Sequence, residues 1–272
     1  MKTVNMFVLV LVLLVLPCSA HADLLSQYGL NISDSNMYND NVNLYQLFNN
    51  YFADQLGESG LYKSSNDLFN DRGVDPYTDW TTNGSQLVGA FKVAALGHEM
   101  SMTDTDQNVV ASLIHVGGTV NIGATNGITD LSGQKVLNVA DGLTVNFQLD
   151  AYWGNDLVYA WSSNPNGNDG SLGKVGDNMI HMIALDITDL YNMKYGTNNN
   201  SVYMFGWEDL HLTGLGGGSP ADWDYQDFVA ILTNVKPTSS ATPEPASMLI
   251  FGLGGAFAGV FAYRRRTNKN GK

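Results

Sequence analysis

An uncharged apolar segment near each end is the feature that most constrains how this 272-residue chain can fold. At the amino end, Lys2 precedes an unbroken apolar run over residues 6–16, and small residues follow at Ala20 and Ala22. A basic start, a short apolar core and small residues at those two positions are typical of a secretory signal peptide. We therefore predict that residues 1–22 form a signal peptide, which is cleaved between Ala22 and Asp23.

Two other interpretations of this segment are weaker. A membrane anchor would need a longer apolar run to cross a hydrocarbon core of about 30 Å. A lipoprotein signal would use Cys18, but Pro17 stands directly before it, where such a signal needs a small residue. Cys18 is the only cysteine, so the mature protein is expected to contain no disulfide and no thiol chemistry.

The second apolar segment, residues 246–263, carries no charge and is followed directly by Arg264, Arg265 and Arg266. Its length is near the lower limit for a transmembrane helix. The arginine cluster is expected to stay in the cytoplasm, which places the rest of the chain on the far side of the membrane. We predict a single transmembrane helix over residues 246–263 and a basic cytoplasmic tail over residues 264–272.

Pro243, Glu244 and Pro245 precede this helix directly. A Pro-Glu-Pro, a short glycine-rich apolar helix and a terminal arginine cluster, in this order, resemble the PEP-CTERM sorting signal. The resemblance implies recognition by an exosortase-type membrane enzyme of Gram-negative bacteria that make exopolysaccharide. It also implies processing near the Pro-Glu-Pro and a final location at the cell surface or outside the cell, with membrane contact only through the terminal signals.

The body between the signals, residues 23–242, is strongly acidic. The signals hold six of the 13 basic residues and one of the 26 acidic residues, which leaves seven basic against 25 acidic residues and a formal charge of −18. Such a surface repels nucleic acid and anionic membranes, so we expect neither as a partner. It suits divalent cations or a hydrated matrix.

The body is predicted to be mainly β, as an antiparallel β-sandwich of jelly-roll-like form with a short N-terminal helix. The helix is expected within residues 43–56, because Leu44, Leu47, Phe48, Tyr51 and Phe52 share one helical face. Short apolar segments with turn-rich connections predict strands, at residues 87–96, 108–116, 119–122, 143–152, 157–161, 179–187, 201–207 and 225–234. We therefore divide the body into an N-terminal helical and loop segment (23–85), the sandwich (86–236) and a linker (237–245).

The candidate site is an acidic cluster late in the body, in the segments W-E-D-L and D-W-D-Y-Q-D-F-V. Oxygens that converge at a loop are what Ca²⁺ requires, and the candidates are Glu208, Asp209, Asp222, Asp224 and Asp227. Asp222 and Asp224 share a face of an extended chain, whereas Asp227 needs a bend near Gln226. Glu208 and Asp209 point to opposite faces of a regular strand, so only one of them is expected to join without a bulge. An acidic loop without a bound ion is the alternative.

These segments are similar to a calcium-associated β-sandwich module, the DUF4114 family, which is common in exported PEP-CTERM proteins. The five acidic residues match the family's motif position by position, with Gln226 and Ala221 as departures from it. His181 and Met182 match a second motif, in which Ile180 replaces an acid and Asp177 is a possible substitute. The resemblance implies a Ca²⁺-stabilised sandwich at these residues.

Together these observations favour a non-enzymatic exported surface or matrix protein, associated with exopolysaccharide or biofilm. A carbohydrate-binding module is the alternative, with Tyr152, Trp153 and Trp161 as rings that could stack on sugars. A glycoside hydrolase using Glu208 and Asp224 is less favoured, because many pairs among 25 acids could mimic its two carboxylates. His98 and Glu99 begin like a zinc motif, but Met102 stands where the second histidine must be.

Overall fold

The computed structural model describes residues 25, 28–30, 32–34, 43–118, 120, 122–123, 127–170, 176–213 and 221–238. Residues 23–238 belong to one compact unit. The predicted signal peptide, the Pro-Glu-Pro, the transmembrane helix and the basic tail lie outside the described residues. Within the described part, none of the helices has the length and apolar character needed to cross a membrane.

The described body is a single antiparallel sheet of nine strands, with the order β3-β2-β5-β1-β9-β8-β7, while β4 pairs with β1 and β6 pairs with β5. The strands are β1 (Trp80–Lys92), β2 (Gly97–Thr103), β3 (Val109–Val116), β4 (Thr129–Val136), β5 (Thr144–Trp153), β6 (Asp156–Ser162), β7 (Met182–Asp186), β8 (Val202–Trp207) and β9 (Phe228–Pro237). The prediction of a mainly β, antiparallel body is confirmed. A sandwich of two separate sheets is not confirmed, because the pairing of Trp80 with Val145 joins β1 to β5.

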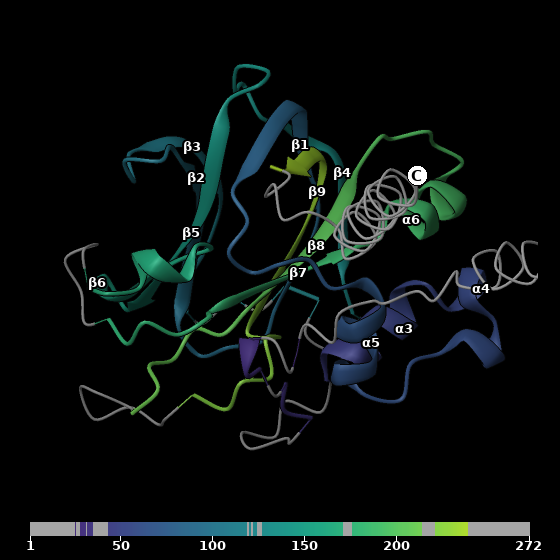
Figure 1. Cartoon of the computed structure of the whole chain (residues 1–272), viewed down its shortest axis with the longest axis horizontal. Helices are drawn as coiled ribbons and strands as arrows, with labels where there is room; N and C mark the ends of the chain where they lie inside the picture. The colour runs from purple at the N-terminus through teal and green to yellow at the C-terminus, as the bar shows by residue number, and fades with distance from the viewer. Residues whose placement is uncertain are drawn as a thin grey trace, which may run out of the picture. The chain divides into compact units, whose positions relative to one another are not determined.

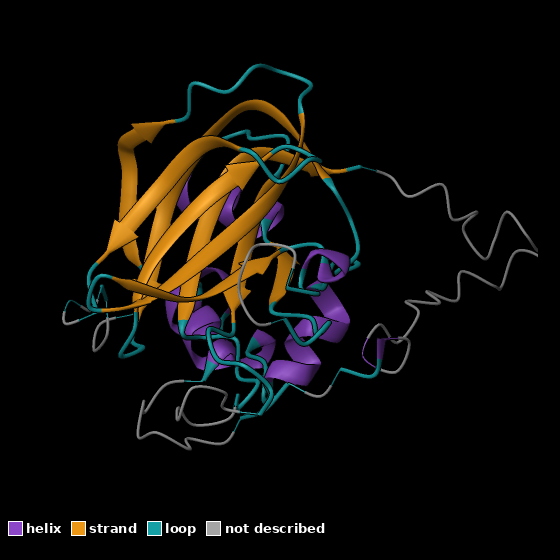
Figure 2. Ribbon diagram, turned by 90° about the vertical axis from the view of Figure 1, so that its left-hand side faces the viewer, coloured by secondary structure: helices purple, strands orange, loops and turns teal. Residues whose placement is uncertain are grey.

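This sheet curls over itself (Figure 2). The rings of Phe147 on β5 and Phe205 on β8 have centroids 4.6 Å apart, although β1 and β9 lie between these strands in the sheet. In a flat sheet, three strand spacings would separate them by about 14 Å. Trp80 contacts both rings. The curl therefore encloses one aromatic core between distant strands.

The helices form a second core on the other face of the β1, β9, β8 and β7 strands. They are α3 (Leu44–Tyr51), α4 (Ala53–Leu56), α5 (Ser65–Arg72) and α6 (Thr188–Tyr195), with a short 3₁₀ turn at Glu58–Gly60, whereas a second 3₁₀ turn, at Pro165–Gly167, contacts β6. In Figure 1 they lie on the side of β7 and β8, away from β2, β3, β5 and β6. The apolar face of α3 packs in a cluster with residues such as Phe91, Ile183 and Val229.

The predicted helix over residues 43–56 is confirmed, but it is interrupted after Tyr51. It begins with a capping box between Asn43 and Gln46 and breaks at Phe52, whose ψ of 18° leaves the helical range. Helix α5, capped by the Ser64 side chain on the Asp67 amide, and helix α6 were not expected. Both are short and weakly amphipathic, which removes the periodic signal that marks a helix in sequence.

Most predicted strands are present with shifted bounds. β1 begins at Trp80, before the boundary placed at residue 86. Of the strand expected over residues 119–122, the structure describes residues 120 and 122, and Ile122 forms an isolated bridge with Lys92. The strand expected from residue 225 begins at Phe228. β4 was not predicted, because its sequence T-D-L-S-G-Q-K-V has little apolar alternation.

Candidate metal centre

Four buried carboxylates converge where β8 ends and β9 begins. Glu208, Asp222, Asp224 and Asp227 each place one oxygen within 4.8 Å of the others. Their side chains are almost inaccessible to solvent, with Glu208 fully buried and Asp227 7% exposed. Among the described residues this is the only group of three or more His, Cys, Asp or Glu side chains with that spacing. Four of the five predicted ligands are therefore brought together.

The backbone before β9 is what gathers three of these carboxylates. Trp223 and Tyr225, on either side of Asp224, have φ values of 60° and 56°. Positive φ is unfavourable for aromatic residues and costs about 1–3 kcal/mol each, so surrounding contacts must hold the segment in place. The bend expected near Gln226 is present, at Tyr225 and Asp227. The segment before it is not regularly extended, because Trp223 has a positive φ.

Two contacts hold this segment on the sheet. The Tyr225 hydroxyl donates to the Ile180 carbonyl at 2.7 Å. Gly206 on β8 lies so close beneath the segment that a Cβ there would sit 2.5 Å from the Tyr225 carbonyl oxygen. A residue without a side chain at position 206 therefore lets the acidic segment approach Glu208.

Amide donors orient three of the carboxylates. Glu208 accepts from the Leu210 amide at 3.1 Å and from the Trp223 amide at 2.7 Å. Asp227 Oδ2 accepts from the Asp209 amide at 3.0 Å. Asp224 accepts from both the backbone and the side-chain nitrogen of Gln226. The oxygens are thus held in fixed positions before any ligand arrives.

The carboxylates of this group repel one another. Burial, together with repulsion from Asp209, Asp222 and Asp224, raises the pKa of Glu208 well above its usual range. Burial and the same kind of repulsion raise the pKa of Asp227 well above its usual range. Lys92 donates to the Ala94 carbonyl, and burial lowers its pKa despite the attraction of Asp209 and Asp227. A divalent cation with oxygen ligands fits such a donor set.

Asp209, the fifth predicted ligand, is not in this group. Its Oδ2 lies 2.7 Å from Nε2 of His98 on β2. Both side chains are buried. The opposite orientations expected for Glu208 and Asp209 are therefore found, and Glu208 is the one that faces the cluster.

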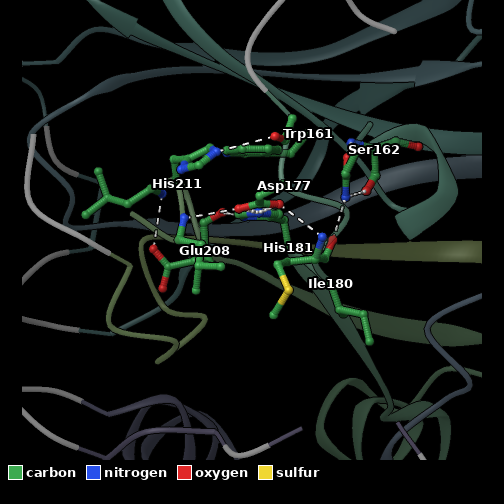
Figure 3. Close-up of polar contacts among 12 residues, drawn as sticks. Trp161, Ser162, Asp177, Ile180, His181, Glu208 and His211 are labelled. Carbon is green, nitrogen blue, oxygen red and sulfur yellow. Dashed lines mark hydrogen bonds and ion pairs between the residues drawn. The ribbon is translucent and has the colours of Figure 1, made fainter. Parts of the chain in front are cut away.

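A stack of aromatic rings supports the backbone of Glu208 and Asp209 (Figure 3). The His181 ring lies parallel to that of Trp161, with centroids 3.6 Å apart. His181 Nδ1 faces the Glu208 carbonyl at 3.1 Å, and Nε2 faces Asp177 Oδ1 at 3.0 Å. Both ring nitrogens face oxygen atoms, so the ring bridges Asp177 to the Glu208 carbonyl. The sequence indicated His181 and Asp177 as candidates near the site. In the structure they support the backbone at Glu208, and neither belongs to the group of four carboxylates.

The Asp177 carboxylate is satisfied within this frame. Although burial acts to raise it, hydrogen bonds from His181 and from the amides of Leu212 and Met179 hold the pKa of Asp177 below its ordinary value. The Trp161 indole donates to the Asp209 carbonyl at 3.0 Å.

Trp161 is fully buried, whereas Trp153 is 69% exposed. Of the three rings considered for sugar stacking, Trp161 is therefore unavailable.

Comparisons with known proteins identify the C-terminal signal. Residues 241–266 match the model of the PEP-CTERM protein-sorting motif, as predicted from the Pro-Glu-Pro and the arginines. Among solved structures, the C-terminal domain of the BC2L-C lectin from Burkholderia cenocepacia is similar at 12% identity with a TM-score of 0.29, over 57% of this chain and 93% of that domain. No curated protein matches significantly. The resemblance to the DUF4114 module is not confirmed by these comparisons.

Proposed function

We propose that this chain is an exported, non-enzymatic protein of the cell surface or extracellular matrix, with a Ca²⁺-stabilised β body. In this proposal an exosortase-type enzyme processes the sorting signal, and the mature protein works beside exopolysaccharide. The sorting motif over residues 241–266 supports the destination. The buried group of Glu208, Asp222, Asp224 and Asp227 supports the cation.

The destination is tested by the intact mass and the cellular fraction of the mature protein from its producing cells. We expect a mass that begins at Asp23 and ends near the Pro-Glu-Pro at residues 243–245, in a surface or extracellular fraction. A protein that retains residues 246–272 and stays in the inner membrane would contradict the sorting part of the proposal. A mass that begins at Cys18 with a lipid attached would instead establish the lipoprotein alternative.

The Ca²⁺ part rests on one observation, the burial of four carboxylates with oxygens within 4.8 Å of one another. Like charges this close oppose folding unless they are protonated or bound to a cation. Ca²⁺ accepts several carboxylate oxygens in a flexible geometry, whereas Mg²⁺ demands a tight octahedron and keeps more water. We expect millimolar Ca²⁺ to raise the melting temperature of the protein above its value in chelator, and Mg²⁺ to raise it less. An unchanged melting temperature would contradict this part.

The likeness to the calcium-associated DUF4114 module belongs to the same proposal. Its support is the match of the acidic residues to that module's motif, together with the proximity of four of them. We further propose that the curled sheet is a jelly-roll-like sandwich, with the Phe147–Phe205 contact as its interior.

Carbohydrate binding is the second candidate. It is favoured by Trp153, which is 69% exposed at the end of β5, next to Tyr152. Correctly folded protein that gives no signal on a glycan array would count against it. Glycoside hydrolysis has less support, because Glu208 and Asp224 are buried and a hydrolase needs both carboxylates beside an accessible sugar.

A further inference from the structure

Asp209 connects two strands, β2 and β6, to the carboxylate group without joining it. Its side chain bonds to His98 on β2, and its carbonyl accepts from Trp161 on β6. Its amide donates to Asp227 Oδ2 at 3.0 Å. Asp209 therefore orients the candidate ligand Asp227, while contacts from β2 and β6 hold Asp209 itself in place.

The His98 ring packs against Phe228 and makes its polar contact with Asp209. The ring is fully buried, and Nδ1 has no hydrogen-bond partner. The only polar contact of the ring among the described residues is therefore the one with Asp209. A buried carboxylate and imidazole are costly unless they pair, and removal of one partner is strongly unfavourable. The pair thus holds the Asp209 side chain, and with it the direction of the Asp209 amide.

We propose that Asp209 and His98 are positioning residues for the cation site, and that Asp209 is not a ligand. This inference rests on the Ca²⁺ site proposed above. The His98–Asp209 bond sets the direction of the Asp209 amide. The amide in turn orients the Asp227 carboxylate, one oxygen of which lies within 4.8 Å of the other three carboxylates. Groups that orient metal ligands in this way are worth about 10–100-fold in metal affinity.

The experiment uses Tb³⁺ as a luminescent substitute for Ca²⁺ on the protein recovered from the producing cells. Titration measures affinity, and luminescence lifetimes in H₂O and D₂O measure the number of waters on the bound ion. We expect His98→Ala to weaken binding about tenfold and to add coordinated water, because Asp227 is no longer held. His98→Gln, whose amide nitrogen can reach Asp209, is expected to restore most of the affinity. His115→Ala is the matched control, since His115 on β3 is exposed with its side chain 63% accessible.

A second comparison separates a positioning residue from a ligand and does not depend on the folding of His98→Ala. Asp209→Asn keeps the backbone amide and an acceptor for His98, so its water number is expected to match that of the wild type. Asp227→Asn removes a ligand charge, so it is expected to gain water and lose affinity. Two results would overturn the positioning role but leave the proposed Ca²⁺ site intact. One is a higher number of waters on the ion bound to Asp209→Asn. The other is a folded His98→Ala variant with the affinity and water number of the wild type. A wild-type protein that binds neither Tb³⁺ nor Ca²⁺ would overturn the proposed site, and this inference with it.

Discussion

The imidazole of His181 lies flat on the indole of Trp161, with an angle of 3° between the ring planes. The two residues come from the chain before β7 and from β6, so the stack joins distant strands directly behind the Glu208 backbone. Stacked aromatic rings contribute to stability beyond the area that they bury. His181 therefore packs on Trp161 with its ring face, and each of its two ring nitrogens has a partner, Asp177 or the Glu208 carbonyl.

Replacement of His181 by Phe is expected to keep the ring contact but destabilise the protein by about 3 kcal/mol, because it leaves the buried Asp177 carboxylate without its side-chain partner. Denaturant unfolding in saturating Ca²⁺ measures this change. The same substitution at the exposed His115 is the control and is expected to change stability little. Equal effects at the two positions would show that the His181 contacts do not stabilise the fold.

The stabilisation from Asp177 is expected to disappear in acid. The folded state holds the pKa of Asp177 below the ordinary value of 3.8. Its contribution is therefore complete above that value and is lost as the pH falls through the lower folded pKa. The gap in unfolding free energy between the wild type and Asp177→Asn should be widest near neutral pH and narrow below about pH 4. A gap that stays constant down to about pH 2 would contradict this assignment.

Asp224→Asn is expected to have opposite effects with and without Ca²⁺. Asp224 contributes to the raised pKa of both Glu208 and Asp227, so in chelator its neutralisation should stabilise the protein by about 1 kcal/mol. With Ca²⁺ the variant loses a ligand charge, and tenfold weaker binding removes about 1.4 kcal/mol of the Ca²⁺-dependent gain. Thermal unfolding in both buffers tests the reversal. Asp106→Asn, at an exposed turn, is the control and should show neither effect.

Gly206→Ala is expected to destabilise the protein by about 1–3 kcal/mol and to weaken Ca²⁺ binding, because the new methyl would meet the Tyr225 carbonyl at 2.5 Å. Gly117→Ala is the matched control, since a Cβ at Gly117 meets nothing within 4 Å. Chemical unfolding and a Ca²⁺ titration of both variants measure the two effects. If both glycines tolerate alanine equally, the acidic segment does not depend on the close approach at Gly206.

The signals that could be predicted from the sequence are local. The sorting motif is contiguous, so its residues identify it without any fold. The alternation of β5 and the 3.6-residue period of α3 are likewise carried by neighbouring residues, and both elements lie close to their predicted bounds. β4 lacks such alternation, and its strand form comes from pairing with β1.

Which acidic residues belong to the site depends on contacts between residues that are far apart in the sequence. Strand alternation predicted that only one of Glu208 and Asp209 would join the carboxylate group. The local sequence does not indicate which one turns away, because His98, the partner of Asp209, is 111 residues earlier. The turns at Trp223 and Tyr225 are also unexpected, since aromatic residues disfavour positive φ. Tertiary contacts such as Tyr225 with Ile180 stabilise that conformation against its local preference.

The pairing of β9 also has a mechanical consequence. Any pull that travels along the chain from the sorting signal enters the folded body at Thr238, whose amide and hydroxyl both donate to the Asp79 carbonyl. From there it reaches β9, which is bonded to β1 on one side and to β8 on the other. Withdrawal of this strand must break two ladders together, so the body resists traction at the end by which a cell would tether it.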